Sequence, residues 1–258
     1  MRVEVIASTT FYDQKAESVT GHKYASWFDL SVDPIGSIDE LAEFAGRNCY
    51  QAWERKNPKT ATNKGYLANI IYHGHFSVLE HGSVTFYIDG ISRSLTHELI
   101  RHRHLSFSEL SQRYVDVTEA EFITPPALLD VIQEEDQNVS WEQSNSNFRK
   151  DGAAKEILKT YQSIYNRVFT NLATKGVFGF KQRKKAREAA RAVMPNCIET
   201  KIVVTGNLRA WRDVLSKRYH EAADEEIKLL ATLILEHLRE IAPNSVMDIP
   251  DKPYGSPA

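Results

Sequence analysis

The sequence predicts an α/β or α+β fold in which helices flank a small, central, mostly antiparallel sheet. Several long stretches repeat apolar residues at the spacing of an amphipathic helix, whereas three short stretches alternate apolar and polar residues as half-buried strands do. The three alternating stretches are far apart in the chain. Helices therefore outnumber strands, and a sheet of so few separated strands needs helices to cover it.

The N-terminal part of the chain is expected to form a strand, a loop and a helix. Residues 2–7 alternate and are rich in Val and Ile, which predicts the strand. We expect a loop over residues 8–35. Ser37, followed three residues later by Glu40, has the capping-box pattern of a helix start, and this helix should run towards Trp53.

The next part is expected to form a helix, a strand and another helix. Helical spacing predicts a helix over residues 61–72. Residues 83–89 alternate strictly, which indicates a half-buried strand that should end in a turn at Gly90. The helix after that turn opens residues 97–114, a stretch with many polar and charged side chains.

The C-terminal half is expected to be mainly helical around one strand. Helical spacing predicts a helix over residues 153–173, and a strongly basic helix over residues 181–194 should stop before Pro195. Residues 199–205 alternate as a strand. They lead into a long helical region over residues 207–241.

Length and composition fit one globular domain. The 258 residues are enough to bury a sizeable core, so we expect a single domain over residues 1–258. Residues 127–150 are polar with few apolar anchors, which predicts a flexible insertion. The Pro-rich tail, residues 243–258, should be extended.

Charge and cysteine content narrow the class of protein. The formal net charge is -2, so any preference for anions must come from local clusters. Cys49 and Cys197 are the two cysteines; they have no C-x-x-C spacing and follow no signal peptide, which predicts a reducing compartment and a cytoplasmic protein. No apolar run has the length of a membrane helix, and we expect no membrane role.

Residues 97–114 carry cations, imidazoles, carboxylates and hydroxyls. Arg101, Arg103 and Arg113 predict a ligand with a phosphate or a planar acidic group, because a guanidinium pairs with such groups bidentately. In one continuous helix Arg101 and Arg103 would point to opposite sides, whereas Glu98 would share a face with Arg101. Either the helix ends near Arg101, or the two arginines serve different ligands or different subunits.

The stretch from His75 to His81 is expected to be a loop that contacts a ligand. A spacing of six does not place the two histidines on one helical face, and no third ligand is evident, so we expect no metal. His75 and Ser77 are better interpreted as hydrogen-bonding groups beside a ligand. The alternative is that the histidines bond only to the local backbone.

Two later segments also carry candidate groups. Arg187 and Arg191 are four residues apart on the basic helix, where Arg191 could reach an anion, although the same charges could be a solvated face. Asn207 is expected to cap the following helix, whose N-terminus suits an anionic or carbonyl-bearing ligand. Arg209 and Asp213 could form a surface pair.

These segments together resemble one family. Arg101-His102-Arg103, seven residues and then Ser111 form the R-H-R-x7-S signature of the flavin-dependent thymidylate synthases. Three further blocks resemble that family in the family's order: His75-x-Ser77-x-x-Glu80-His81, Arg187-x-x-x-Arg191 and residues 207–218. The resemblance covers nearly the whole chain except the polar stretch after Pro126 and the tail.

The resemblance implies a homotetramer with four active sites, each assembled from several subunits around FAD. It implies conversion of dUMP to dTMP, with 5,10-methylenetetrahydrofolate as the one-carbon donor and FADH2 as the hydride donor. NADPH regenerates the reduced flavin. It implies no cysteine nucleophile, and neither nucleic acid nor a membrane as a partner.

By matching positions, the resemblance implies two sets of contacts and one catalytic residue. Arg218 is the candidate for stabilising negative charge on the pyrimidine as N3 ionises. The flavin set is Ser77, Arg101, His102, Arg103, Glu109, Asn207, Leu208, Arg209 and Asp213. The dUMP set is Glu98, Leu99, Ile100, Arg101, Glu109, Leu110, Ser111, Gln112, Arg113, Arg191 and Arg218.

Two positions depart from the family pattern. Ser108 stands where Asn is frequent, and Asp213 stands where Asn or His is common. An ionised carboxylate accepts hydrogen bonds but cannot donate them, so Asp213 could meet a flavin only as an acceptor.

Two other interpretations compete with the synthase. The basic helix over residues 181–191 would also suit a nucleic-acid-binding protein, which should lose affinity steeply with salt and retain no flavin. A flavoprotein of another reaction type, such as an NADPH oxidase-like reductase, is the third. Of the three, only a synthase yields dTMP from dUMP and methylenetetrahydrofolate.

Overall fold

The computed structural model describes residues 1–22, 37–53, 57–118, 120–126, 128 and 152–256. Within them the protein is α+β, with eight α-helices and a four-stranded antiparallel sheet in the order β1-β2-β4-β3. The strands are β1 (Arg2–Ser8), β2 (Ser83–Ser92), β3 (Ser106–Glu109) and β4 (Glu199–Asn207).

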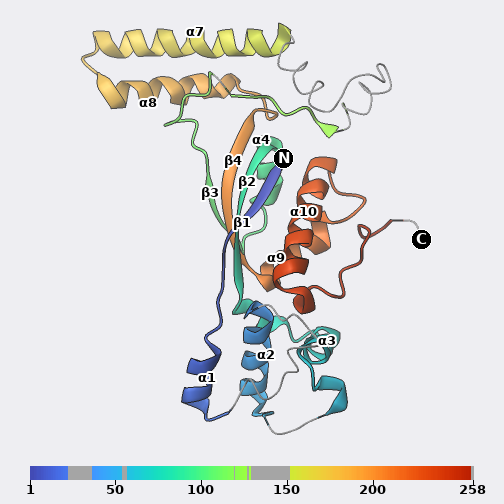
Figure 1. Ribbon diagram of the computed structural model, residues 1–258. Helices are drawn as coiled ribbons and strands as arrows, with labels where there is room; N and C mark the ends of the chain where they lie inside the picture. Colours follow the sequence, from blue (N-terminus) through green and yellow to red (C-terminus); the bar gives the residue numbers. More distant parts are fainter. Residues whose placement is uncertain (23–36, 54–56, 119, 127, 129–151, 257–258) are drawn as a thin grey trace. The chain divides into compact units, whose positions relative to one another are not determined.

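Helices account for most of the remaining described residues (Figure 1). The α-helices are α1 (Asp13–Thr20), α2 (Ser37–Tyr50), α3 (Asn63–Tyr72), α4 (Arg93–Leu99), α7 (Gly152–Thr174), α8 (Gly179–Ala190), α9 (Leu208–Arg218) and α10 (Glu225–Ile241). Short 3-10 helices are η2 (Pro58–Thr60), η3 (Phe76–Glu80), η4 (Arg191–Val193) and η5 (Pro243–Ser245). Among the described residues, none of the helices is both long and apolar enough to cross a membrane.

The chain divides into two compact units, each of which we describe by itself. Unit 1 comprises Met1–Arg2, Ile88–Leu99 and Ser108–Ile202. Unit 2 comprises Val3–Tyr87, Ile100–Phe107 and Val203–Ala258. The prediction of a single domain over the whole chain stays a prediction.

The core of unit 2 fixes the start of α9 against the sheet. Trp211 is fully buried, and its indole N–H donates to the backbone oxygen of Val84 at 3.2 Å. The ring of Phe86 meets that indole edge to face, with centroids 5.0 Å apart. A Cβ at Gly206 would come within 2.2 Å of Cδ2 of Leu105 and within 3.2 Å of Nε1 of Trp211, so a larger residue here would require these side chains to move.

Unit 1 is built around the α7–α8 helical hairpin, whose helices lie side by side (Figure 1). Its buried cluster consists of Val117, Tyr161, Ala190 and Ile198. Ala190 ends α8 inside this cluster, which places the residues that follow, beginning with Arg191, at the rim of the core.

Most predicted elements are confirmed, and the first correction concerns the predicted loop after residue 7. Residues Asp13–Thr20 form α1, although only Ala16 of that helix is buried. A helix that buries one residue has no apolar stripe from which to predict it. The helix ends at Gly21, which adopts φ 73° and donates its N–H to the Glu17 carbonyl. A glycine at this position is a common signal of a helix end. The remaining loop residues, 23–36, lie outside the described residues.

The predicted turn at Gly90 is wrong, because β2 continues to Ser92. Gly90 has φ 66°, and a Cβ there would come within 3.1 Å of the backbone nitrogen of Met1. The glycine therefore serves a close approach between strands and not a chain reversal.

The polar stretch from residue 97 leaves its helix early. Helix α4 ends at Leu99, and residues 100–105 form turns before β3, a strand that the sequence did not predict. Of the two alternatives, the helix ending near Arg101 is therefore the one observed. The shared helical face of Glu98 and Arg101 is not formed.

The predicted helix over residues 207–241 is two helices. Helix α9 ends at Arg218, and His220 forms a bridge with Tyr254 before Asp224 caps α10 by accepting the N–H of Glu226 at 3.0 Å. Similarly, the basic helix ends at Ala190 and is followed by η4. Apart from Leu128, the predicted insertion lies outside the described residues. In the predicted tail, Pro243–Ser245 form η5.

Candidate functional site

Unit 2 contains a hollow rich in cations, with a volume of about 580 Å³. Its walls come from the turns after Leu99 and from the last part of α9. Four lining side chains are cationic, and Asp213 is the one carboxylate among the residues that line it. An anionic ligand fits such a surface. The lining residues are Ile100, Arg101, His102, Arg103, His104, Asp213, Lys217 and Arg218.

His102 is one of the residues that line this hollow, and it is largely buried, with 7% of its surface exposed. Its Nε2 accepts the Nε–H of Arg218 at 3.2 Å, and its Nδ1 lies 3.3 Å from Oδ2 of Asp213. A guanidinium only donates, so the proton of the neutral ring belongs on Nδ1, from which it is donated to Asp213. Burial lowers the pKa of His102 and the Arg218 charge lowers it further, which outweighs the opposing effect of Asp213.

Both carboxylate oxygens of Asp213 are engaged by the protein. Oδ1 accepts from Nζ of Lys217 at 2.6 Å, and Oδ2 faces His102. Burial raises the pKa of Asp213, but the bonds from Lys217 and His102 outweigh it and hold the pKa below its usual value. The predicted surface pair of Arg209 with Asp213 is wrong, because Arg209 pairs with Glu80.

A second hollow of about 420 Å³ lies at the N-terminus of α9 and shares His104 and Asp213 with the first. Asn207 caps the helix as predicted, since its Oδ1 accepts the N–H of Ala210 at 2.9 Å. Leu208 is fully buried, and its N–H donates to the backbone oxygen of Gly82. The lining residues are Glu80, His104, Asn207, Arg209, Ala210 and Asp213. Ser77 is exposed on η3 and does not line either hollow.

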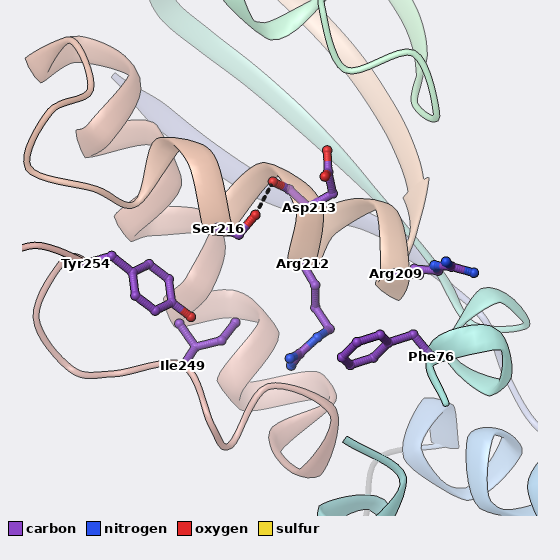
Figure 2. Close-up of a pocket in the computed structure, with 7 residues that line it drawn as sticks. All are labelled: Phe76, Arg209, Arg212, Asp213, Ser216, Ile249 and Tyr254. Atoms are coloured by element: carbon purple, nitrogen blue, oxygen red, sulfur yellow. Dashed lines mark hydrogen bonds between the residues drawn. The ribbon is translucent and has the colours of Figure 1, made fainter. Parts of the chain in front are cut away.

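A third hollow of about 260 Å³ lies beyond Arg209 and Asp213 (Figure 2). The side chain of Arg212 lines this hollow, and its guanidinium Cζ lies 5.2 Å from the centroid of the Phe76 ring. Two bonds of 2.7 Å to Asp248 and one to the Ser245 carbonyl hold that guanidinium. Arg212 is therefore a fixed wall. The other lining residues are Ser216, Ile249 and Tyr254.

Unit 1 contains the other group of predicted residues, around the turn that begins at Ser111. The N–H groups of Tyr114 and Val115 both donate to the Ser111 carbonyl. Arg187 of α8 donates to the Tyr114 carbonyl at 2.7 Å and to Asp116 at 3.2 Å. The basic helix thus holds this turn in shape.

Two arginines of unit 1 carry buried donors that lack a partner among the described residues. The Nε atoms of Arg113 and Arg187 are buried and form no hydrogen bond with the described residues. Arg113 also lies 2.9 Å from Glu188 through Nη2. Arg191 is exposed at the start of η4. A guanidinium has further donors at Nη1 and Nη2, which can pair with an anion such as a phosphate.

The remaining predicted residues of unit 1 are tied to the protein. Glu109 lies 3.1 Å from Arg93 and accepts the hydroxyl of Thr96 at 3.0 Å. Leu110 donates its N–H to the backbone of Lys201. Glu98 is half-buried, whereas Leu99 and Gln112 are buried.

Sequence reasoning gave no role to Lys217 or Glu188 and no ion pair to Glu80. Lys217 follows Asp213 by four residues on α9, a spacing from which the pair could have been predicted. The Arg209–Glu80 pair joins positions 129 apart, and Glu188 meets Arg113 from another element, so no local pattern indicates either contact.

His75, Cys49 and Cys197 all lie in the described part of the chain. No group of three or more His, Cys, Asp or Glu side chains there could hold a metal ion. His75 stacks against His73 with ring centroids 5.8 Å apart. Cys49 is an exposed free thiol, and Cys197 is a partly buried one.

Comparison with known proteins identifies the family. A family described as "Thymidylate synthase complementing protein" matches residues 32–244. A protein of Mycobacterium phage D29 named "Probable flavin-dependent thymidylate synthase" is 49% identical over 257 residues, 98% of each chain. The chain belongs to the flavin-dependent thymidylate synthase family. The predicted resemblance is confirmed.

Other relatives in this family are equally similar. A flavin-dependent thymidylate synthase of Mycolicibacterium gilvum is 46% identical over 249 residues, 96% of this chain and 89% of the relative. One from Mycobacterium avium is 50% identical over 243 residues, 94% and 87% of the two chains. The similarity thus extends across the residues of both units.

Proposed function

We propose that this protein makes dTMP from dUMP by FAD-mediated reductive methylation, with 5,10-methylenetetrahydrofolate as one-carbon donor and NADPH as reductant. The observation that carries this proposal is the contact of Arg218 with the buried His102, at a hollow with four cationic side chains, in a chain of this family. Such a surface can bind the anionic parts of a flavin dinucleotide and can polarise a pyrimidine.

The hollows at the two ends of α9 suit FAD. Arg101 and Arg103 offer positive charge for its diphosphate, and the capped N-terminus of α9 offers backbone N–H groups. When bound, FAD supplies the hydride for the transferred carbon. The residues we assign to it are Ser77, Arg101, His102, Arg103, Glu109, Asn207, Leu208, Arg209 and Asp213.

The turn at Ser111 suits the phosphate of dUMP. Arg113 places a partly exposed guanidinium beside this turn, and Arg187 keeps the turn in shape. These groups would orient the nucleotide before reaction. The residues we assign to dUMP are Glu98, Leu99, Ile100, Arg101, Glu109, Leu110, Ser111, Gln112, Arg113, Arg191 and Arg218.

Arg218 is the residue to which we assign catalysis. A guanidinium stays protonated at all physiological pH values, so it can stabilise the negative charge that forms on the pyrimidine ring when N3 loses its proton. This charge makes C5 nucleophilic towards the one-carbon unit. No cysteine needs to add to the ring, and neither Cys49 nor Cys197 lines the hollows of unit 2.

We further propose a cytoplasmic homotetramer whose active sites use residues of several subunits. Arg101 and Arg103 lie in the turns after α4, where each side chain could bind a different ligand. A nucleic-acid-binding role for the basic helix is disfavoured, because Arg187 is bonded to Tyr114 and Asp116 and Lys184 lies over the ring of Tyr114.

The test is the dUMP-dependent oxidation of the reduced flavin with the nucleotide product identified. The protein should be purified with bound flavin and should form dTMP only when methylenetetrahydrofolate is present. Arg218→Ala should retain flavin reduction by NADPH and lose at least about a hundredfold in dTMP formation, the usual cost of one charge-stabilising group. Full turnover by Arg218→Ala would remove the assigned role, and a colourless preparation that binds oligonucleotides would remove the synthase.

A further inference from the structure

We propose that Asp213 and His102 are positioning residues that orient Arg218 through a chain of two hydrogen bonds, Asp213 to His102 to Arg218. The inference rests on the proposed function only in giving Arg218 a catalytic task. It assigns to Asp213 a task within the protein, in addition to any contact with the flavin.

The chain follows from the donor and acceptor properties of its three members. Arg218 can only donate through Nε, so Nε2 of His102 must present its lone pair at 3.2 Å. The ring proton then lies on Nδ1, where Oδ2 of Asp213 can accept it at 3.3 Å. Asp213 thus favours the one tautomer of His102 that can bond to Arg218.

Holding Nε fixes more than one atom of Arg218. The guanidinium is planar, so a bond at Nε defines the plane and direction of Nη1 and Nη2. His102 is itself held, since it is buried and bonded through both nitrogens. Fixing the rotatable bonds of an arginine before a ligand arrives lowers the entropy cost of binding.

The two hydrogen bonds from Asp213 to His102 to Arg218 also predict that the position of Arg218 depends on pH. His102 is faced by Asp213, Lys217 and Arg218 of α9, and it shares its hollow with Arg101, Arg103 and His104. Protonation of its Nε2 would replace the acceptor of Arg218 with a second cation. Burial and the cations lower the pKa of His102, so the ring stays neutral at physiological pH and the contact should fail only in acid.

Substitutions at two residues near His102 should shift its pKa in opposite directions. Asp213→Asn removes a carboxylate that raises the pKa of His102, so the pKa should fall. Lys217→Gln removes a cation that lowers the pKa, so the pKa should rise. Both side chains are partly exposed, so both variants should fold.

The first measurement is NMR of protein labelled with 15N-histidine, with His102 identified among the nine histidines by its loss in His102→Gln. The native ring should show the proton on Nδ1, and its pKa should shift down in Asp213→Asn and up in Lys217→Gln. A proton on Nε2 in the native protein, or shifts of the same sign in the two variants, would overturn the proposal. This readout does not require synthase activity.

The second measurement is the pH profile of kcat for dTMP formation. The acid limb should follow the pKa of His102, moving to lower pH in Asp213→Asn and to higher pH in Lys217→Gln. Asp213→Asn should also lose about tenfold in kcat on the plateau, the value of one hydrogen bond to a charged group, with a smaller change in KM for dUMP. His102→Gln, whose amide oxygen accepts at any pH, should lose the acid limb.

The two proposals fail in different ways. If the native protein forms no dTMP, the synthase is wrong while the NMR result still tests the hydrogen-bonded chain. If dTMP forms and the acid limb stays at the same pH in Asp213→Asn and Lys217→Gln, the positioning role is wrong and the synthase stands.

Discussion

Oδ1 of Asn207 accepts the backbone N–H of Ala210 at 2.9 Å, which makes Asn207 both the cap of α9 and a lining residue of the hollow at its N-terminus. Asn207→Ala should lower the free energy of unfolding by about 1 kcal/mol, because the first turn loses its cap. It should also weaken FAD binding. Denaturant unfolding of the flavin-free protein and fluorescence titration with FAD measure the two effects.

Asn207→Asp separates the cap from the ligand contact. A carboxylate caps a helix as well as an amide does, so stability should stay close to native. The hollow already contains Glu80 and Asp213, so a third carboxylate should weaken binding of an anionic flavin. Equal FAD affinity in the native protein and Asn207→Asp would argue against a flavin at this end of α9.

Arg187 holds the turn that we assign to the phosphate of dUMP, through the Tyr114 carbonyl and the Asp116 carboxylate. Arg187→Ala should raise KM for dUMP about tenfold, since the turn loses a charged donor that keeps its shape. Flavin content should not change. Steady-state kinetics with dUMP varied, together with the flavin absorption of the purified variant, check both statements.

Arg183→Ala is the matched control, because Arg183 is an exposed arginine of the same helix. Its KM for dUMP should equal the native value. If both variants raise KM to the same extent, the general positive charge of α8 attracts the nucleotide, and the specific contacts of Arg187 do not matter.

Asp39 joins α2 to the segment after α10 and should make stability depend on pH. Its fully buried carboxylate accepts the N–H groups of Asn244 and Ser245 and the hydroxyl of Ser245. Burial, the largest effect, raises the pKa of Asp39 from its ordinary value of 3.8 to about 6. Between these two pH values the folded protein therefore binds a proton that the unfolded chain has lost.

The sign of the effect follows directly. Because the folded pKa is the higher one, the contribution of Asp39 to stability is greatest in acid and falls as pH rises towards 6. Asp39→Asn has no such titration and places an NH2 group against backbone donors, so it should be less stable at every pH. The stability difference between native and variant should be about 1 kcal/mol larger at pH 5 than at pH 7. Denaturant unfolding at both pH values measures it, with the exposed Glu4→Gln as control.

Cys49 and Cys197 should be dispensable for the reaction. Both are free thiols, and neither lines a hollow of unit 2. A Cys49→Ala, Cys197→Ala double variant should therefore fold and keep kcat for dTMP formation within about twofold of native, since no transition-state contact is lost. A folded double variant without any synthase activity would show that a cysteine takes part.

The parts of the fold that were predicted are those set by local patterns. Strands β1, β2 and β4 alternate, and Asn207 caps its helix through a residue three positions away. Helix α1 was not predicted, because it buries only Ala16 and so shows no apolar stripe in the sequence. Strand β3 is four residues long and carries a single apolar residue, Phe107, so its pairing with β4 stabilises a strand that its own sequence does not specify.

In the candidate site, too, local motifs were predicted from the sequence, whereas contacts between distant positions were not. The R-H-R segment was found from its spacing, but the partner of His102 is Asp213, 111 positions later. Local spacing favoured Arg209 with Asp213, and the fold instead pairs Arg209 with Glu80 and Asp213 with Lys217. Two exposed residues four apart gain little from pairing, so tertiary contacts easily replace the local pair.

A mixing experiment tests whether active sites are shared between subunits. Arg113→Ala and Arg218→Ala should each strongly lower dTMP formation, since one removes a proposed phosphate contact and the other the catalytic cation. If a site takes Arg113 from one copy and Arg218 from another, tetramers that contain both variants should regain native arginines at about a quarter of their sites. If both arginines come from one copy, every site lacks one of them, and mixing should restore nothing. Mixed tetramers isolated through two different affinity tags, assayed beside each variant alone, decide between these outcomes.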